Sequence, residues 1–274
     1  MKSAIALTLI LVVAAQTADW HKIQSYGSAI GASHANLNII RGAVVPPGLL
    51  PFQVLIAIDG DLTDICGGSL IKADKVLTAA HCCDGAKFFG VFLATINFAI
   101  EEPNRKYVTT TSFKIHEKYT NISDYDICVI HLDEEVRGEG IATIRLPSRS
   151  QVKTTFDGFR ATIAGWGNTK NNDHSNTVLR YTDLIIMKKT FCSQYYNDFD
   201  AEKLMCTYNV VYASATCKGD SGGPLIITES DGVKTQVGIL SFGPKPGVGG
   251  CESHRPDGHV RLTAHLDWIK SGLE

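Results

Sequence analysis

Short, mostly apolar runs rich in residues that favour β-strands, separated by Gly and Pro and by the polar residues Asn and Asp, fill most of the chain from residue 51 onward. Runs of this length and spacing are typical of β-strands, and they predict about ten of them. The expected strands are residues 52–58, 75–78, 88–98, 110–116, 126–132, 160–164, 184–188, 224–228, 235–242 and 259–262. Only residues 263–273 predict a helix, because Leu266, Ile269 and Leu273 recur at helical spacing.

The regular succession of strands and turns indicates an all-β protein of the sandwich or barrel type. The 274 residues would suit two ordinary domains, yet all-β chains of this size often form one compact unit. Residues 133–151 are polar and contain Leu146, Pro147 and Ser148 near their end. We therefore expect the connection between two halves there.

The first 18 residues predict a secretory signal peptide, with Lys2 at the start, a mostly apolar stretch over residues 4–15 and small residues toward Ala18. The apolar stretch is too short to span a bilayer. We therefore expect a secreted, extracellular protein. Because exported proteins meet an oxidising environment, the eight cysteines favour disulfides over metal ligands or redox thiols.

The charge of the chain excludes two classes of partner. It has 26 basic and 28 acidic side chains, which gives a formal net charge of -2. Binding to nucleic acid or to an anionic membrane needs clustered Lys and Arg. No nucleic acid and no membrane partner is therefore expected.

Three segments contain the residue types of nucleophilic catalysis. They are L-T-A-A-H-C-C around His81, D-Y-D-I-C-V-I around Asp126 and C-K-G-D-S-G-G-P-L around Ser221. A serine hydroxyl becomes a good nucleophile only when a histidine accepts its proton, and that histidine needs a carboxylate to fix its tautomer. The three segments supply one of each.

The glycines around Ser221 predict a second part of such a site. Gly219, Gly222 and Gly223 leave the backbone unobstructed, so the amides of Gly219 and Ser221 can point together at a developing oxyanion. The alternative is that G-D-S-G-G is only a glycine-rich surface turn. A histidine or an aspartate taken singly is also more often structural than catalytic.

Together these segments resemble the chymotrypsin-like serine proteases, and the chain order His81, Asp126, Ser221 matches that family. The resemblance implies an all-β fold of two six-stranded β-barrels with a C-terminal helix. It also implies a secreted serine endopeptidase that works through an acyl-enzyme. In that reaction His81 is the general base and then the acid, Asp126 orients it, and Ser221 attacks the scissile carbonyl.

The resemblance further implies synthesis as a zymogen. The I-I-R-G of residues 39–42 is similar to the mature N-terminus of the family, so a cut is expected after Asn38. The freed amino group of Ile39 would pair with Asp220, whose carboxylate would otherwise be buried without a partner. Asn38 departs from the usual basic residue before the cut, which leaves the activating protease open.

The domains implied are a signal peptide 1–18, an activation propeptide 19–38 and a peptidase domain 39–274, with barrels over about 39–145 and 150–262 and a helix over about 263–273.

The specificity pocket implied by the resemblance has a neutral floor. Ala215, six residues before Ser221, takes the place where trypsin-like enzymes carry an aspartate. A small apolar floor favours substrate side chains such as Leu, Phe, Tyr or Met. Ser241, Phe242 and Gly243 are similar to the strand that pairs with the substrate backbone beside the pocket.

One residue departs from a chymotrypsin-like pocket. Asp257 falls at a wall position that is usually glycine, and the surrounding S-F-G, G-C-E and P-D elements resemble the arthropod serine collagenases, or brachyurins. Those enzymes have broad specificity, and a carboxylate on the wall could accept a Lys or Arg side chain. The alternative is that Asp257 pairs with His259 or faces water.

The resemblance implies three disulfides, namely Cys66 with Cys82, Cys192 with Cys206, and Cys217 with Cys251. Cys83 and Cys128 remain, and they lie two residues after His81 and Asp126 respectively. Because those two catalytic side chains must hydrogen-bond, their segments could bring the cysteines near, and we predict a fourth disulfide.

The competing interpretation is a metal cluster of His81, Cys82 and Cys83. Adjacent ligands in H-C-C leave no spacer of the kind that zinc sites use between cysteines, and we expect no metal and no cofactor.

The remaining expectations concern modification and partners. Asn121 begins an N-x-S glycosylation sequon. Protein or peptide substrates and proteinaceous protease inhibitors are the expected partners of a monomeric chain. The alternative function is a catalytically silent homologue that acts as a binding or venom protein, although such homologues usually lack a member of the triad.

Overall fold

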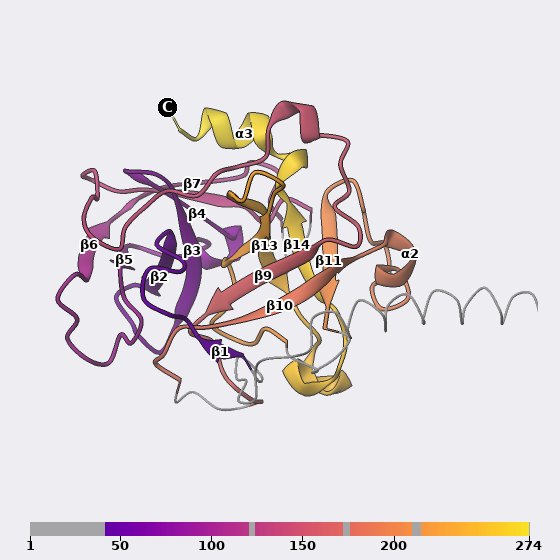
Figure 1. Ribbon diagram of the computed structural model, residues 1–274, viewed down its shortest axis with the longest axis horizontal. Coiled ribbons are helices and arrows are strands. Elements are labelled where there is room, and N and C mark those ends of the chain that lie inside the picture. Colours follow the sequence, from indigo (N-terminus) through magenta and orange to yellow (C-terminus); the bar gives the residue numbers. More distant parts are fainter. Residues whose placement is uncertain (1–41, 121–123, 172–175, 210–214, 274) are drawn as a thin grey trace, which may run out of the picture.

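A computed structural model describes residues 42–120, 124–171, 176–209 and 215–273. Within these ranges the chain forms fourteen strands and two short α-helices (Figure 1). The strands are β1 Ala43–Val44, β2 Gln53–Ile58, β3 Ile65–Lys72, β4 Lys75–Thr78, β5 Phe89–Leu93, β6 Lys106–Thr110, β7 Ser112–Ile115, β8 Cys128–His131, β9 Arg160–Gly165, β10 Arg180–Met187, β11 Leu204–Tyr208, β12 Pro224–Thr228, β13 Lys234–Phe242 and β14 Asp257–Arg261. The helices are α2 Lys189–Cys192 and α3 Leu266–Ser271. The predicted all-β fold is confirmed.

The first half of the chain forms a seven-stranded antiparallel sheet in the order β6-β5-β2-β3-β4-β8-β7. It lies at the left of Figure 1. Its two outermost strands, β6 and β7, are separated only by Thr111, so the sheet curls until its edges are consecutive in the chain. Fully buried side chains such as Leu55, Phe89 and Ile130 fill its interior.

The second half forms a closed barrel. Its strands follow the order β10-β11-β14-β13-β12-β9, and β9 pairs back onto β10. β1 adds to the outside of this barrel through the register of Ala43 with Tyr181, so the first described strand belongs to the second half. A separate cluster that includes Ile163, Leu225 and Val237 is buried inside the barrel.

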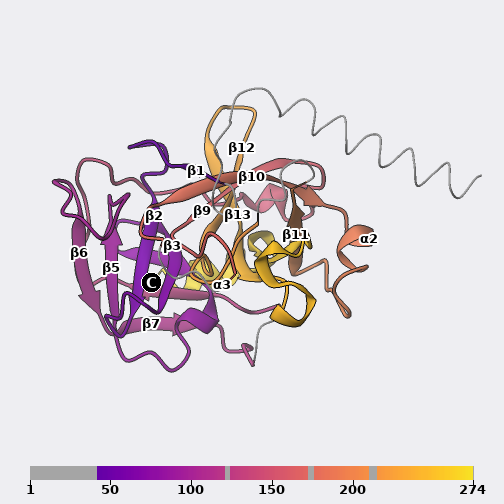
Figure 2. The same ribbon diagram turned by 90° about the horizontal axis from the view of Figure 1, so that it is seen from below.

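Buried polar contacts join the two halves. The Ser69 hydroxyl on β3 donates to Gln236 Oε1 on β13 at 2.6 Å, and Gln53 Nε2 on β2 donates to the carbonyl of Ala164 on β9 at 3.1 Å. Figure 2 shows the two halves side by side. This packing brings loops from both halves together, which is where the candidate site lies.

Four strands and the extent of the helix differ from the sequence-based expectation. The pattern missed β1, β3, β6 and β11, and α3 is shorter than the predicted 263–273 because residues 262–264 form a separate 3-10 turn. No helix among the described residues is long and apolar enough to cross a membrane.

All eight cysteines form the four predicted disulfides: Cys66–Cys82, Cys83–Cys128, Cys192–Cys206 and Cys217–Cys251.

Candidate active site

His81 and Asp126 lie side by side where two neighbouring strands end. His81 sits in a single 3-10 turn, Ala80–Cys82, shortly after β4, and Asp126 comes two residues before β8. The Oδ2 atom of the fully buried Asp126 carboxylate lies 2.8 Å from His81 Nδ1, and Oδ1 accepts a hydrogen bond from the His81 backbone amide, also at 2.8 Å. The carboxylate therefore fixes both the ring and the backbone of the histidine.

A third donor reaches the same carboxylate from the second barrel. The Ser241 hydroxyl on β13 donates to Asp126 Oδ2 at 2.5 Å. The sequence assigned Ser241 only to the strand beside the pocket, and nothing in its local pattern indicated this contact. Through it, the second barrel helps to position a residue of the first.

The Ser221 loop packs tightly against the end of β4. The Gly67 amide donates to the Ser221 carbonyl at 2.7 Å. Gly222 has φ +80°, and a Cβ there would lie 2.1 Å from the Thr78 hydroxyl oxygen, three residues before His81. Only glycine fits this approach, so the glycine after Ser221 brings the serine and histidine segments together.

Backbone contacts, rather than a side-chain hydrogen bond, bring the Ser221 and His81 segments together. Among the described residues no hydrogen bond joins the Ser221 hydroxyl to the imidazole. Such bonds are often long in a free site and tighten when substrate binds.

The amides of Gly219 and Ser221 differ from their neighbours in the same loop. The backbone amides of Asp220, Gly222 and Gly223 donate to the carbonyls of Cys217, Leu240 and Asp220, respectively. Within the described part of the chain, those of Gly219 and Ser221 donate to no acceptor. Two unused donors separated by a single residue form the arrangement that binds an oxyanion.

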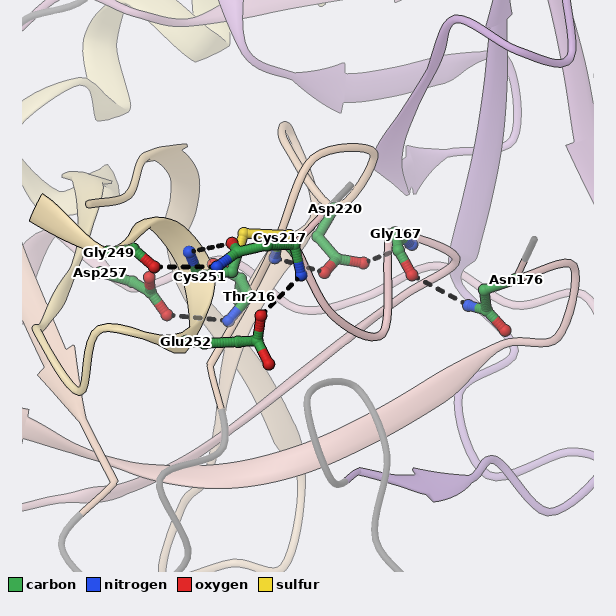
Figure 3. The surroundings of a disulfide bond; sticks show 10 residues. Gly167, Asn176, Thr216, Cys217, Asp220, Gly249, Cys251, Glu252 and Asp257 are labelled. Atoms are coloured by element: carbon green, nitrogen blue, oxygen red, sulfur yellow. Dashed lines mark hydrogen bonds between the residues drawn. A yellow bond between two sulfur atoms is a disulfide. The ribbon is translucent and has the colours of Figure 1, made fainter. Parts of the chain in front are cut away.

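The Asp220 carboxyl lies in a buried cradle of backbone amides. It is 1% exposed, and it accepts hydrogen bonds from the amides of Gly167 at 2.7 Å and Cys217 at 2.9 Å (Figure 3). A Cβ on Gly167 would lie 2.5 Å from the carboxyl carbon, so the cradle requires glycine. Burial raises the pKa of Asp220 to about 6, and no cationic side chain among the described residues forms an ion pair with it.

Asp257 lies beside the predicted pocket residues. Its Oδ2 accepts a hydrogen bond from the amide of Thr216, the residue after Ala215, at 3.0 Å (Figure 3). Its Oδ1 is buried without a hydrogen-bond partner and lies 3.3 Å from where a Cβ on Gly243 would stand. Burial raises the pKa of Asp257 to about 7. The structure thus brings Ala215, Gly243 and Asp257 together.

Neither alternative environment for Asp257 is found. The residue is 2% exposed, which excludes a carboxylate facing bulk water. His259 Nε2 pairs instead with the Thr207 hydroxyl at 2.8 Å, and burial lowers the pKa of His259 to about 3. The histidine is therefore neutral and does not compensate the charge of Asp257. Phe242 also belongs to this region, because its ring covers the backbone of Gly258.

The cysteines beside His81 are not available as thiolate ligands. The ligand atoms of Cys66, His81 and Cys82 lie within 4.8 Å of one another, yet both sulfurs belong to one disulfide. Cys83, the third member of the alternative metal cluster, is bonded to Cys128. Two of the predicted site residues, Ile39 and Asn121, lie outside the described residues.

Comparisons with known proteins agree on one family. A family model described as Trypsin matches residues 39–269. A chymotrypsin of Phaedon cochleariae is 37% identical over 87% of this chain and 83% of its own length. A brachyurin of Leptuca pugilator is 36% identical over 85% of this chain and 97% of its own length. A solved structure of HL collagenase superposes with a TM-score of 0.73 and 31% identity, over 85% of this chain and 97% of its own.

Proposed function

This chain belongs to the trypsin family of chymotrypsin-like serine proteases and is a serine endopeptidase, and we propose that His81, Asp126 and Ser221 are its catalytic triad. The observation that carries this assignment is the bidentate hold of Asp126 on His81, with the Ser221 loop packed against the same strand end. The retention of all three side chains argues against the catalytically silent alternative.

The Asp126 contact selects the tautomer that catalysis needs. An ionised carboxylate only accepts hydrogen bonds, so Nδ1 of His81 carries the proton and Nε2 is left as the acceptor. Nε2 then takes the proton of the Ser221 hydroxyl as its oxygen attacks the substrate carbonyl, and later gives that proton to the leaving amine. Water hydrolyses the acyl-enzyme by the same steps, with His81 acting as base again.

The unused amides of Gly219 and Ser221 supply the second element of catalysis. They would donate to the oxygen that becomes negative in the tetrahedral intermediate. Removing one such donor typically costs about 100- to 1,000-fold in rate, because fixed dipoles stabilise charge without having to reorganise.

A serine-directed phosphonate tests the assignment directly. Its phosphorus is attacked by an activated serine oxygen, which displaces the leaving group and leaves a stable adduct. We expect one adduct per chain, located at Ser221 by peptide mass spectrometry. A folded and correctly cut sample that does not react would favour the catalytically silent protein.

The buried carboxyl of Asp220 supports activation by cleavage after Asn38. Its cradle contains only neutral amide donors among the described residues, so a cation that arrived there would be strongly favoured. The new amino group of Ile39 is such a cation.

We expect phosphonate labelling of Ser221 to require that terminus: a chain beginning at Ile39 should react, and one cut a single residue later, beginning at Ile40, should react much more slowly. Equal labelling of the two would contradict this role of Asp220.

Asp257 supports a mixed substrate specificity. The unpartnered Oδ1 faces the pocket strand at Gly243 while Ala215 leaves the floor neutral. An aliphatic or aromatic substrate side chain can bind such a pocket, and a Lys or Arg side chain can in addition donate to Oδ1. We therefore propose broad cleavage after apolar and basic residues, as the resemblance to brachyurins suggests.

Replacing Asp257 should change this preference selectively. Asp257→Gly and the nearly isosteric Asp257→Asn are expected to lower kcat/KM for substrates with Lys or Arg before the scissile bond by about 10- to 100-fold, the value of a hydrogen bond to a charged group. Cleavage after Leu or Phe should change little. The measurement is a matched set of peptide substrates that differ only at that residue, and an unchanged Lys-to-Leu ratio would refute the role.

The same preference should depend on pH. With its pKa raised to about 7, Asp257 is a neutral acid below that pH and a carboxylate above it. The ratio of kcat/KM for a Lys substrate to that for a Leu substrate is therefore expected to rise between about pH 6 and 8, because the triad affects both substrates alike and cancels in the ratio. The Asp257→Asn enzyme serves as the control, and its ratio should stay flat.

Secretion, processing and the partners of the protein also belong to this proposal. Members of the family are typically secreted, and residues 1–18 and 19–38 would provide the signal peptide and the activation propeptide. Protein substrates are the partners of the reaction. A monomeric state, regulation by proteinaceous inhibitors and glycosylation at Asn121 remain predictions.

A further inference from the structure

The sheet that carries His81 and Asp126 stops pairing just before it reaches them. β4 and β8 are antiparallel, and their last register pair is Thr78 with Cys128. His81 lies three residues beyond Thr78, and Asp126 lies two residues before Cys128. Both catalytic side chains therefore stand on segments that have left the hydrogen-bonded ladder, and other contacts must hold them in register.

The turn that carries His81 has little stability of its own. It is one 3-10 turn of three residues, its N-cap residue Ala79 makes no side-chain cap, and few backbone hydrogen bonds hold it. Short 3-10 turns have poor hydrogen-bond geometry. A small rotation of this turn would move the His81 imidazole away from Asp126 and Ser221.

Two adjacent disulfides anchor this turn to different strands. Cys82 is bonded to Cys66 on β3, and Cys83 is bonded to Cys128, the first residue of β8. The second bond ties Cys83, two residues after His81, back to Cys128, the residue that pairs with Thr78 in the ladder, so Thr78 and Cys83 flank His81 and both are tied to Cys128. His81 is thus enclosed between a ladder contact and a covalent link to the same residue of the aspartate strand.

We propose that the Cys83–Cys128 disulfide is a positioning element for catalysis, which holds the His81 turn against the Asp126 segment. The inference rests on the proposed triad. Asp126 contacts the backbone amide of His81 as well as its ring, so its hydrogen bonds depend on where the turn lies and not only on the rotamer of the side chain. A covalent link two residues along each segment fixes that position.

The structure offers a matched control for this role. Cys192–Cys206 is also buried and closes a shorter loop, with a sequence separation of 14 against 45, but it joins α2 to β11 and touches none of the triad segments. The sulfurs of Cys83–Cys128 are buried, which makes a double substitution a cleaner test than a reducing agent.

The first experiment compares the two disulfides. Cys83→Ala/Cys128→Ala is expected to lower kcat about 10-fold with KM unchanged within about twofold, since misplacing catalytic groups by about 1 Å can cost about 100-fold and the hydrogen bonds to Asp126 limit the displacement. Cys192→Ala/Cys206→Ala should lose thermal stability and keep its kcat. Assays at 10 °C, with circular dichroism confirming that each variant is folded, separate activity from unfolding. If the alanine pair does not fold, Cys83→Ala/Cys128→Val refills more of the buried volume and gives the same measurement.

A double-mutant cycle distinguishes positioning from general stabilisation. In an Asp126→Ala background the carboxylate that the disulfide would hold against His81 is absent, so removing Cys83–Cys128 should change the residual kcat less than twofold. A full 10-fold loss in that background, or an unchanged kcat in the otherwise unaltered enzyme, would overturn the inference. Failure of the unaltered, correctly cut enzyme to hydrolyse peptides or to label at Ser221 would instead contradict the proposed function.

Discussion

Replacing Ser221 with alanine is expected to lower kcat about a millionfold, the loss that removal of the nucleophile causes in serine proteases. Alanine leaves the backbone of the loop unchanged, so the amides of Gly219 and Ser221 and the substrate pocket should remain. KM should therefore change little. The measurement is hydrolysis of a peptide amide by the purified and correctly cut variant, with phosphonate labelling as a second readout that should disappear.

The control for this change is a serine on the surface of the same protein. Ser193 follows α2, is exposed, and lies far along the chain from the triad segments. Ser193→Ala should keep full activity and full labelling. If Ser221→Ala retained more than about one thousandth of the activity, acyl-enzyme chemistry at Ser221 would be wrong, because oxyanion stabilisation and binding alone give only about 1,000- to 10,000-fold over water.

The pattern of the chain predicted most of the strands, and at β3 the cause of its failure is a close approach between backbones. β3 contains two adjacent glycines, which weaken any strand pattern. A Cβ on Gly67 would stand 2.9 Å from Gly223 Cα, so these positions are small because the Ser221 loop presses on the strand. The local pattern of a strand cannot reveal a requirement for glycine when that requirement comes from a segment more than 150 residues away.

The residues of the candidate site also divide into those that the sequence could predict and those that it could not. The triad and the glycine loop could be predicted from local motifs, because nucleophile, base and acid each sit in a distinctive segment. Three of the disulfides were implied by the family resemblance, and the fourth followed from the expected contact of the His81 and Asp126 segments. The contact of Ser241 with Asp126 could not be predicted, since it depends on how β13 of one barrel packs against the other. The burial of Asp257 also needed coordinates: the sequence left open whether its carboxyl faced water, and its protonation follows from that exposure.

Asp126→Asn should lower kcat about 10,000-fold without disturbing the fold, the loss that this change causes in related serine proteases. The carboxylate accepts hydrogen bonds from the His81 amide, His81 Nδ1 and the Ser241 hydroxyl. An asparagine side chain has only one acceptor oxygen, and its amino group must occupy the other place. If that group faces His81 Nδ1, the ring has to accept there, so its proton moves to Nε2 and the base that Ser221 needs is lost.

The Ser241 contact provides the comparison that isolates this tautomer effect. Ser241→Ala removes one donor to the carboxylate but leaves His81 Nδ1 as a donor, so we expect a loss of only about 10- to 100-fold. Both variants are measured by kcat on a peptide amide and by the rate of phosphonate labelling at Ser221, and the two rates should fall together. Equal losses in the two variants would mean that Asp126 acts only through the number of its hydrogen bonds. A much greater loss in Asp126→Asn would assign its main role to choosing which imidazole nitrogen carries the proton.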